Sequence, residues 1–314
     1  MKVRKYEVGR HESLLIVSVL LGMLLASGAA GCAPQSEAAD KFVVAVTVLP
    51  QAGLVEAVAG DKVEVVVMVP PGASPHTYEV MPEQMVKLST ARMYARVGPP
   101  MEFEVVWMDR LVSANPDMLV VDCSQGIDFI EAVEDTHGDD DEGESGGSGE
   151  IVHSGADPHI WLSVRNAQVM VTNICAGLTQ VDPANAEYYL HNCKAYVDAL
   201  SQLDLELADA LYELANRTFI VYHPAFGYFA RDYNLSQLAI EQGGSEPDAQ
   251  YMVRLIQVAR EHDIRVIFVA PQFSSRSAEV VAEEIGGEVV IIDPVARDYI
   301  PNMRAITAAI QQVA

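Results

Sequence analysis

Strands and helices alternate in two separate stretches of the chain, and this alternation restricts the possible folds more than any other feature. The first expected strand, Phe42–Val48, is a run of β-branched residues, and helical segments separate the strands from Phe42 to Asp122 and again from Phe219 to Val313. The expected strands are Phe42–Val48, Lys62–Val69, Met93–Val97, Met118–Asp122, Phe219–Tyr222, Ser236–Ile240, Ile264–Ala270 and Glu288–Ile292. A strand–helix–strand order builds a parallel sheet with helices on both faces. We therefore predict an α/β protein with two such lobes.

The centre of the chain is predicted to be helical. Leu162–Val181 and Pro183–Ala215 have helical patterns, and Asp182-Pro183 lies between them as a cap and first-turn pair. The expected parts are a signal peptide at 1–31, a tether at 32–41, an N-terminal lobe at 42–162, a helical linker region at 163–215 and a C-terminal lobe at 216–314.

An acidic segment interrupts the first lobe. Glu134–Glu150 holds eight acidic residues and five glycines, one histidine (His137), and neither lysine nor arginine. Such a composition cannot bury a core, so we expect a mobile loop at 134–150.

The N-terminus is typical of an export signal. A basic stretch precedes an apolar run, Leu14–Ala26, and small residues then lead to Cys32. The run is shorter than the ~20 apolar residues of a transmembrane helix. The segment resembles a prokaryotic lipoprotein signal, although Ala29 stands where such signals favour a larger aliphatic residue. We expect lipidation of Cys32 and anchoring to the outer side of the cytoplasmic membrane, with simple cleavage or an uncleaved anchor as the alternatives.

The formal net charge of −24 excludes one class of partner and favours another. So acidic a surface repels phosphate backbones, so we expect no nucleic-acid partner. The same charge raises the local concentration of cations, although acidity is also a common way to keep a surface protein soluble.

Three of the four cysteines remain if Cys32 carries lipid: Cys123, Cys175 and Cys193. Disulfides persist outside the cytoplasm. Cys175 and Cys193 are candidates for one, because both lie in predicted helices on either side of the Asp182-Pro183 turn. Three buried free thiols are the alternative, and the spacings match no zinc–cysteine motif.

Four short loops place a possible metal ligand after a predicted strand or extended segment. They read Ser74-Pro75-His76, Asp157-Pro158-His159, Tyr222-His223-Pro224 and Ile292-Asp293-Pro294. Ligands of open α/β sheets bind at the carboxyl ends of strands. His76 and His159 belong to the first lobe, and His223 and Asp293 to the second, so together they predict a metal site in the cleft between the lobes. Three imidazoles and one carboxylate would fill a tetrahedral zinc shell and leave no position for a reacting water.

Each of these residues has a simpler interpretation. A single histidine after a strand is usually a hydrogen-bonded loop residue. The prediction therefore depends on the four positions together, and on the prolines that stiffen their loops. Among the other histidines, His191 and His262 are expected at the surface. His137 and His153 flank the acidic loop and either pass metal toward the cleft or are part of a solvated insert.

At these residues the chain resembles the metal-binding subgroup of ABC-transporter solute-binding proteins, which take up zinc or manganese. The resemblance covers about Phe42 to Val313. The motifs that carry it are Ser74-Pro75-His76-Thr77-Tyr78-Glu79, Asp157-Pro158-His159-Ile160-Trp161-Leu162, Tyr222-His223-Pro224-Ala225-Phe226-Gly227-Tyr228, Ile292-Asp293-Pro294, Ser245-Glu246-Pro247 and Pro271-Gln272-Phe273-Ser274. The resemblance implies two Rossmann-like lobes joined by a long rigid helix, with metal in the interlobe cleft. It also implies a permease and its cytoplasmic ATPase as partners, and we expect a monomer.

Zinc is favoured over manganese by ligand type. Imidazole suits zinc, whereas carboxylate and carbonyl oxygens suit manganese. Manganese members of the family tend to carry glutamate where His223 stands, although some three-histidine members are thought to carry both metals. Glu79 could replace or assist Asp293, and Glu241 or Glu246 could orient ligands from behind.

Two other kinds of protein are the alternatives to a metal receptor. An exported zinc metallohydrolase needs an open metal position and a base, which Glu79 could supply, but no His-Glu-x-x-His motif is present. A binder of an organic ligand needs an apolar, aromatic-lined cleft and would not need histidines on both lobes.

Overall fold

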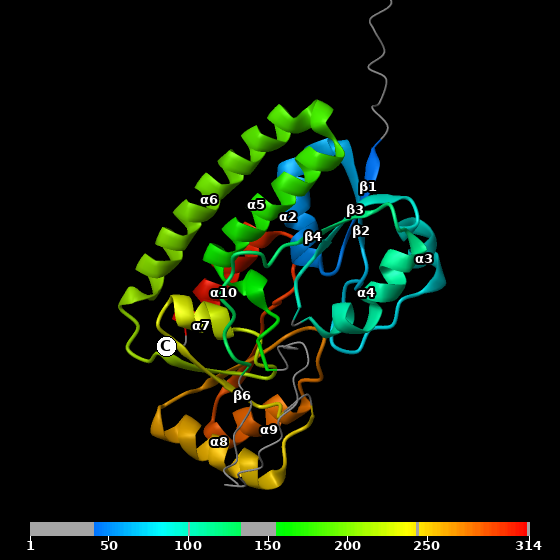
Figure 1. Cartoon of the computed structure of the whole chain (residues 1–314). Helices are drawn as coiled ribbons and strands as arrows, with labels where there is room; N and C mark the ends of the chain where they lie inside the picture. The colour runs from blue at the N-terminus through cyan, green and yellow to red at the C-terminus, as the bar shows by residue number, and fades with distance from the viewer. Residues whose placement is uncertain (1–40, 100, 133–154, 243–244, 313–314) are drawn as a thin grey trace, which may run out of the picture. The chain divides into compact units, whose positions relative to one another are not determined.

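The computed structural model describes residues 41–99, 101–132, 155–242 and 245–312, and within them it contains two parallel four-stranded sheets (Figure 1). The first has the order β2-β1-β3-β4 and the second the order β6-β5-β7-β8. The strands are β1 (Phe42–Val46), β2 (Val63–Val67), β3 (Ala91–Arg96), β4 (Leu119–Asp122), β5 (Thr218–Val221), β6 (Ser236–Ala239), β7 (Val266–Val269) and β8 (Glu288–Ile291). Every predicted strand is present, and the predicted α/β class with two sheet-based lobes is confirmed.

Helices cover both faces of the first sheet. Figure 1 shows α2 (Leu49–Ala59) and α5 (Val164–Val181) on one side of it, and α3 (Pro82–Leu88) and α4 (Glu102–Ala114) on the other. The central strand β1 is buried from Val44 to Val46, because β-branched and small residues there pack under helices on both sides. A short helix, η1 (Gly60–Lys62), leads into β2.

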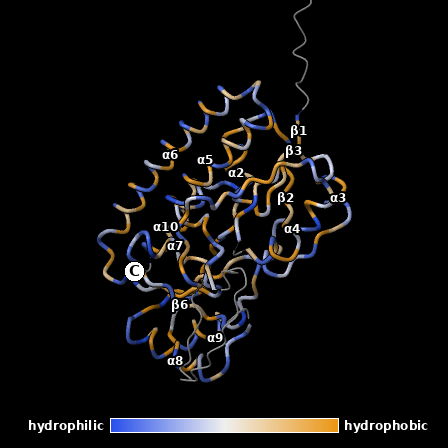
Figure 2. Tube along the Cα trace, in the orientation of Figure 1, coloured by the Kyte–Doolittle hydropathy of each residue, from blue (hydrophilic) through white to orange (hydrophobic). Residues whose placement is uncertain are grey.

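The long helix α6 (Ala186–Tyr212) connects the first sheet to the second. It follows a single turn, η3 (Pro183–Asn185), and packs on α5, α2 and α10 (Tyr299–Gln311). Its buried leucines recur every three or four positions, and Figure 2 shows hydrophobic residues alternating with hydrophilic ones along it. These leucines are Leu200, Leu203, Leu207 and Leu211. The 27 residues of α6 span about 40 Å.

The second sheet is covered differently on its two faces. Helices α8 (Ala249–Glu261) and α9 (Arg276–Ile285) pack together over a small core of their own, which includes Ile220, Ile267 and Val281. The other face belongs to the large core that also fills the first lobe, and α7 (Gly227–Asp232) and α10 contribute to it. One face of the second lobe is therefore continuous with the first lobe. The boundaries 42–162, 163–215 and 216–314 stay a prediction.

The thiols of Cys175 and Cys193 face each other across α5 and α6, and both are free. The Cys175 sulfur contacts the carbonyl oxygen of Tyr189 at 3.6 Å, and the Cys193 sulfur contacts that of Val171 at 3.9 Å. Each thiol thus contacts a backbone carbonyl of the opposite helix, one helical turn before the cysteine of that helix. Cys123 is free and buried. The Cys175–Cys193 disulfide stays a prediction.

Several expectations fall on residues outside the described part of the chain. The signal peptide, the tether, Cys32, the acidic loop 134–150, His137 and His153 all lie there. Among the described residues, no helix is both long and apolar enough to cross a membrane.

Candidate metal centre

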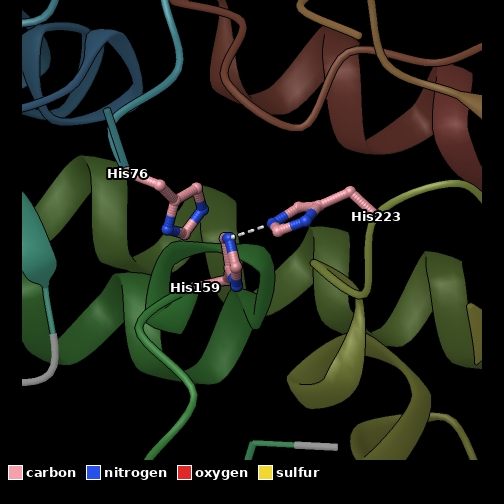
Figure 3. Close-up of side chains that lie close together, drawn as sticks. All are labelled: His76, His159 and His223. Atoms are coloured by element: carbon pink, nitrogen blue, oxygen red, sulfur yellow. Dashed lines mark hydrogen bonds between the residues drawn. The ribbon is translucent and has the colours of Figure 1, made fainter. Parts of the chain in front are cut away.

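Three histidines from distant parts of the chain meet at the carboxyl ends of the two sheets. Each of His76, His159 and His223 offers a ring nitrogen, and these nitrogens all lie within 4.8 Å of one another. The Nε2 atoms of His159 and His223 are 3.2 Å apart, and Figure 3 shows the His76 ring facing the same point. Two unprotonated imidazole nitrogens at this distance repel each other unless a proton or a cation lies between them.

The three loops differ in how they hold their histidines. His76 follows β2 in a proline-rich loop, and its backbone N–H donates to Ser74 Oγ at 3.3 Å. His159 immediately precedes the short helix η2 (Ile160–Leu162), and its backbone N–H donates to Asp157 Oδ1 at 2.8 Å. His223 comes two residues after β5, and its carbonyl oxygen accepts the N–H of Ala225 at 2.8 Å. The helix that follows, α7, begins only at Gly227, after this turn.

A carboxylate stands behind each imidazole. The Nδ1 atoms of His76, His159 and His223 lie 3.1, 2.8 and 2.8 Å from carboxylate oxygens. The partners are, in the same order, Glu102, Asp157 and Glu241. A carboxylate on Nδ1 fixes the tautomer that carries its proton there and leaves Nε2 free for a cation. All three rings are therefore prepared in the same way.

Only one of these three carboxylates was named from the sequence as an orienting residue. The pairing of β5 with β6 places Glu241 beside His223. Val221 lies opposite Ala239 in this register, and His223 and Glu241 each follow two residues later. Asp157 belongs to the Asp157-Pro158-His159 motif, and the side chain of an aspartate can accept the backbone N–H of the residue two positions later. Glu102 was not predicted from the sequence. It is the first residue of α4, which follows β3, and β3 is separated from β2 by β1 in the sheet.

The protonation of the site follows from this arrangement. Burial lowers the pKa of His223 below its ordinary value of 6.5, although the hydrogen bond to Glu241 acts in the opposite direction. Burial alone would raise the pKa of Glu102, but the hydrogen bond and charge of His76 outweigh it, and the pKa is lowered. His223 is thus neutral and Glu102 ionised at neutral pH, which are the forms that cation binding requires.

The walls of the site are apolar. The Phe273 ring stacks on His223 with centroids 4.9 Å apart, and Trp161 meets His159 edge-on at 5.4 Å. The cavity between the rings has a volume of about 20 Å³, and Pro75, Pro294 and Val295 also line it. Such a space admits an ion or a water molecule and excludes organic molecules.

The other predicted ligands lie apart from the three nitrogens. Asp293 Oδ1 accepts the Gln272 amide at 3.2 Å and the backbone N–H of Val295 at 3.0 Å, and Asp293 is outside the group of atoms within 4.8 Å. Glu79 is exposed. Glu246 accepts hydrogen bonds from the hydroxyls of Tyr222 and Ser277.

Comparison with known proteins places this geometry in context. A family model described as ZnuA, zinc-uptake complex component A, periplasmic, matches residues 44–313. The high-affinity zinc uptake system protein ZnuA of Bacillus subtilis is 31% identical over 256 residues, which cover 81% of this chain and 78% of that protein. A putative metal-binding protein of Treponema pallidum is 31% identical over 289 residues, covering 88% of this chain and 87% of that one.

A solved structure agrees with these sequence relatives. The crystal structure of a ZnuA superimposes with a TM-score of 0.78 at 38% identity, over 87% of this chain and 99% of the other.

Proposed function

The chain belongs to the family of periplasmic zinc-uptake components, and on that premise we propose that His76, His159 and His223 bind the zinc ion that the protein delivers to an ABC importer. The protein is an extracytoplasmic receptor, and zinc is its cargo. The observation that carries the ligand proposal is the convergence of three ring nitrogens, each with a carboxylate on the opposite side of its ring.

The donor set favours zinc over manganese. Imidazole nitrogens bind zinc well, whereas manganese prefers oxygen donors. Three rings at these separations suit three corners of a tetrahedron, with Zn–N distances of about 2.0–2.1 Å after small movements of the side chains. Manganese remains the second candidate for the same site.

We assign the fourth position to Asp293. Its neighbours Pro294 and Val295 already line the cavity, and we expect its carboxylate to turn away from Gln272 and bind the ion. Glu79, exposed in the His76 loop, is the alternative ligand. Glu246 is a support for Tyr222, next to His223.

The family consists of solute-binding receptors, and we propose that this member catalyses no reaction. A metallohydrolase must bring a substrate to its metal, and an organic-ligand receptor must enclose its ligand. A cavity of about 20 Å³ with Phe273, Pro75 and Val295 around it accommodates neither.

We further propose that the receptor is a lipid-anchored monomer whose partners are a permease and its cytoplasmic ATPase. The basis is the lipoprotein-like signal that ends at Cys32. A receptor held near the membrane meets its permease at a high effective concentration. Metabolic labelling with a fatty acid should mark the full-length chain and should not mark a Cys32→Ser variant.

The function is tested by titrating chelator-stripped protein, residues 33–314, with zinc and with manganese, and counting bound ions by native mass spectrometry. We expect one tightly bound zinc and weak manganese. His159→Ala should lose the tight ion, and His191→Ala, which changes an exposed histidine of α6, should keep it. Wild-type protein that binds no metal would overturn the proposal, and tight manganese would change the cargo assignment.

A further inference from the structure

The three histidine–carboxylate pairs differ in their exposure to solvent. The carboxylate side chains of Asp157 and Glu241 are 4% and 8% exposed, but that of Glu102 is 50% exposed. The imidazoles follow the same order, since His159 and His223 are 6% and 13% exposed and His76 is 21% exposed. One side of the cluster is therefore open to water, and a negative charge lies on that side.

The remaining directions around the cluster present apolar or buried groups. Phe273 covers His223, and Trp161 is fully buried against His159. Among the described residues that line the cavity, none is acidic. A hydrated cation that approaches through Phe273 or Val295 would lose its water before it met any compensating charge, which is costly. At Glu102 it would meet a carboxylate first.

The backbone that carries Glu102 is firmly held. Glu104, one position after Phe103 in the first turn of α4, is buried, and its two carboxylate oxygens accept the backbone N–H groups of Val97 and Gly98 at 2.6 and 2.9 Å. The Glu104 carboxylate also accepts a hydrogen bond from the hydroxyl of Thr47, which directly follows β1. This turn is thus tied to the carboxyl ends of two strands. Glu102 itself lies in the first turn of a 13-residue helix, where the helix dipole stabilises a negative charge.

We propose that Glu102 is the carboxylate through which the metal ion enters and leaves the site, so that Glu102 sets the rate of exchange. The buried Asp157 and Glu241 act instead on the strength of binding, through the orientation of His159 and His223. This inference rests on the proposed function, because it concerns the path of the same ion.

The proposed role follows from two properties of the Glu102–His76 pair. A fixed negative charge at the most exposed of the three histidine–carboxylate pairs raises the local concentration of cations and the rate of their encounter with the site. The ring behind it is the most exposed of the three, so it is the ring that can turn aside with the least loss of packing. His76 is therefore the last ligand to bind an entering ion and the first to release it.

The charge can be removed without removing the hydrogen bond. In Glu102→Gln the amide oxygen still accepts from His76 Nδ1, so the tautomer is kept while the negative charge is lost. Glu83→Gln is the matched control, since it removes one charge from an exposed glutamate in the first turn of α3, in the same lobe. Glu241→Gln makes the same chemical change at a buried partner.

The test is stopped-flow measurement of zinc association and of zinc release to excess chelator, at low and high salt, on chelator-stripped protein. Glu102→Gln should lower the association rate about threefold to tenfold at low salt, and the difference from wild type should shrink at high salt because salt screens the charge. Glu83→Gln should differ little from wild type. Glu241→Gln should mainly speed release.

Two results would overturn the inference while leaving the receptor function intact. One is zinc association by Glu102→Gln at the rate of Glu83→Gln. The other is faster release in Glu102→Gln with unchanged association, which would make Glu102 an ordinary orienting residue like Glu241. Failure of the wild-type protein to bind zinc at all would instead contradict the proposed function.

Discussion

The segments that carry His159 and His76 offer the same ligand to the same site, but they are held in opposite ways. The His159 segment is buried and joined to the second lobe: the Tyr228 hydroxyl donates to the Asp157 carbonyl oxygen at 2.9 Å, and Trp161 Nε1 donates to the Pro294 carbonyl oxygen at 2.7 Å. The His76 loop is partly exposed, and the polar partners of its histidine, Ser74 and Glu102, both belong to its own lobe.

The difference separates two tasks within one metal site. A segment bonded to both lobes keeps its ligand still, so that no ordering cost is paid when the ion binds. A loop bonded to one lobe can move, so that the ion can enter and leave. The comparison can be tested by disturbing each segment and measuring stability, affinity and pH dependence.

The largest effect is expected on the free energy of unfolding, from Trp161 in the buried His159 segment. Trp161→Ala should destabilise the protein by about 3–5 kcal/mol, because it removes a fully buried ring and its hydrogen bond to Pro294. Tyr78→Ala in the His76 loop should cost about 1 kcal/mol, since Tyr78 is half-buried. Denaturant unfolding measures both. Should Trp161→Ala fail to fold, Trp161→Phe keeps most of the ring and should cost about 1–3 kcal/mol by leaving the Pro294 carbonyl unpaired. Equal costs in the two segments would contradict the comparison.

The next effect is on zinc affinity. Asp157→Asn removes the negative charge behind His159 and should weaken binding about 10–100-fold. Ser74→Ala removes only the acceptor of the His76 backbone N–H and should weaken it less than about threefold. Competition with a chelator of known affinity gives both values. A larger loss in Ser74→Ala would mean that the exposed loop, and not the buried segment, fixes the site.

A smaller loss of affinity is expected from crowding the buried segment from the second lobe. A Cβ atom on Gly227 would lie 2.5 Å from Asp157 Oδ2, so Gly227→Ala must displace the carboxylate that orients His159. We expect about tenfold weaker zinc binding. Tyr228→Phe is the control, because it deletes the hydroxyl that contacts Asp157 without adding an atom, and should have a weaker effect. Wild-type affinity in Gly227→Ala would show that the two lobes are not in close contact here.

The pH dependence of zinc binding should reflect the burial of the site. Protons compete with zinc for imidazole, so affinity falls as pH drops. Burial lowers the pKa of His223 below 6.5, so this ring stays neutral and competes only weakly with zinc until the pH is below that value. Calorimetric titrations between pH 7.5 and 5 should show nearly constant affinity at the upper end and a fall at the lower end. Constant affinity down to pH 5 would argue against histidine ligation.

The smallest effect is expected from the cysteines, which touch neither segment. Oxidation of Cys175 and Cys193 to a disulfide would lower the mass by about 2 Da and block alkylation of both thiols. Zinc affinity should change less than about twofold, because changes at sites without shared contacts have little effect on each other. Intact mass spectrometry of protein from an oxidising compartment, compared with a Cys193→Ser variant, measures this. Full alkylation of both thiols would contradict the predicted disulfide.

Much of the fold could be predicted from local sequence. All eight predicted strands are present, and the clearest of them, such as β1 and β7, are apolar runs rich in β-branched residues because they are buried under helices. Between β5 and α7, residues 224–226 follow His223 in a turn, and α7 begins only after it. Local sequence preferences do not predict this turn between β5 and α7.

The α/β alternation and the histidines of the candidate site could be read from one chain, because the strand runs and the proline-flanked histidines are local features. The carboxylate behind each ring depends instead on the folded molecule. Glu241 and Asp157 are near their histidines through strand register and chain proximity, but Glu102 meets His76 only because α4 starts at the same edge of the sheet. The tertiary structure also decided that Asp293 contacts Gln272, and that one pair is open to water while two are closed. Exposure depends on how the two lobes pack together, and that packing arises from contacts between residues far apart in the chain.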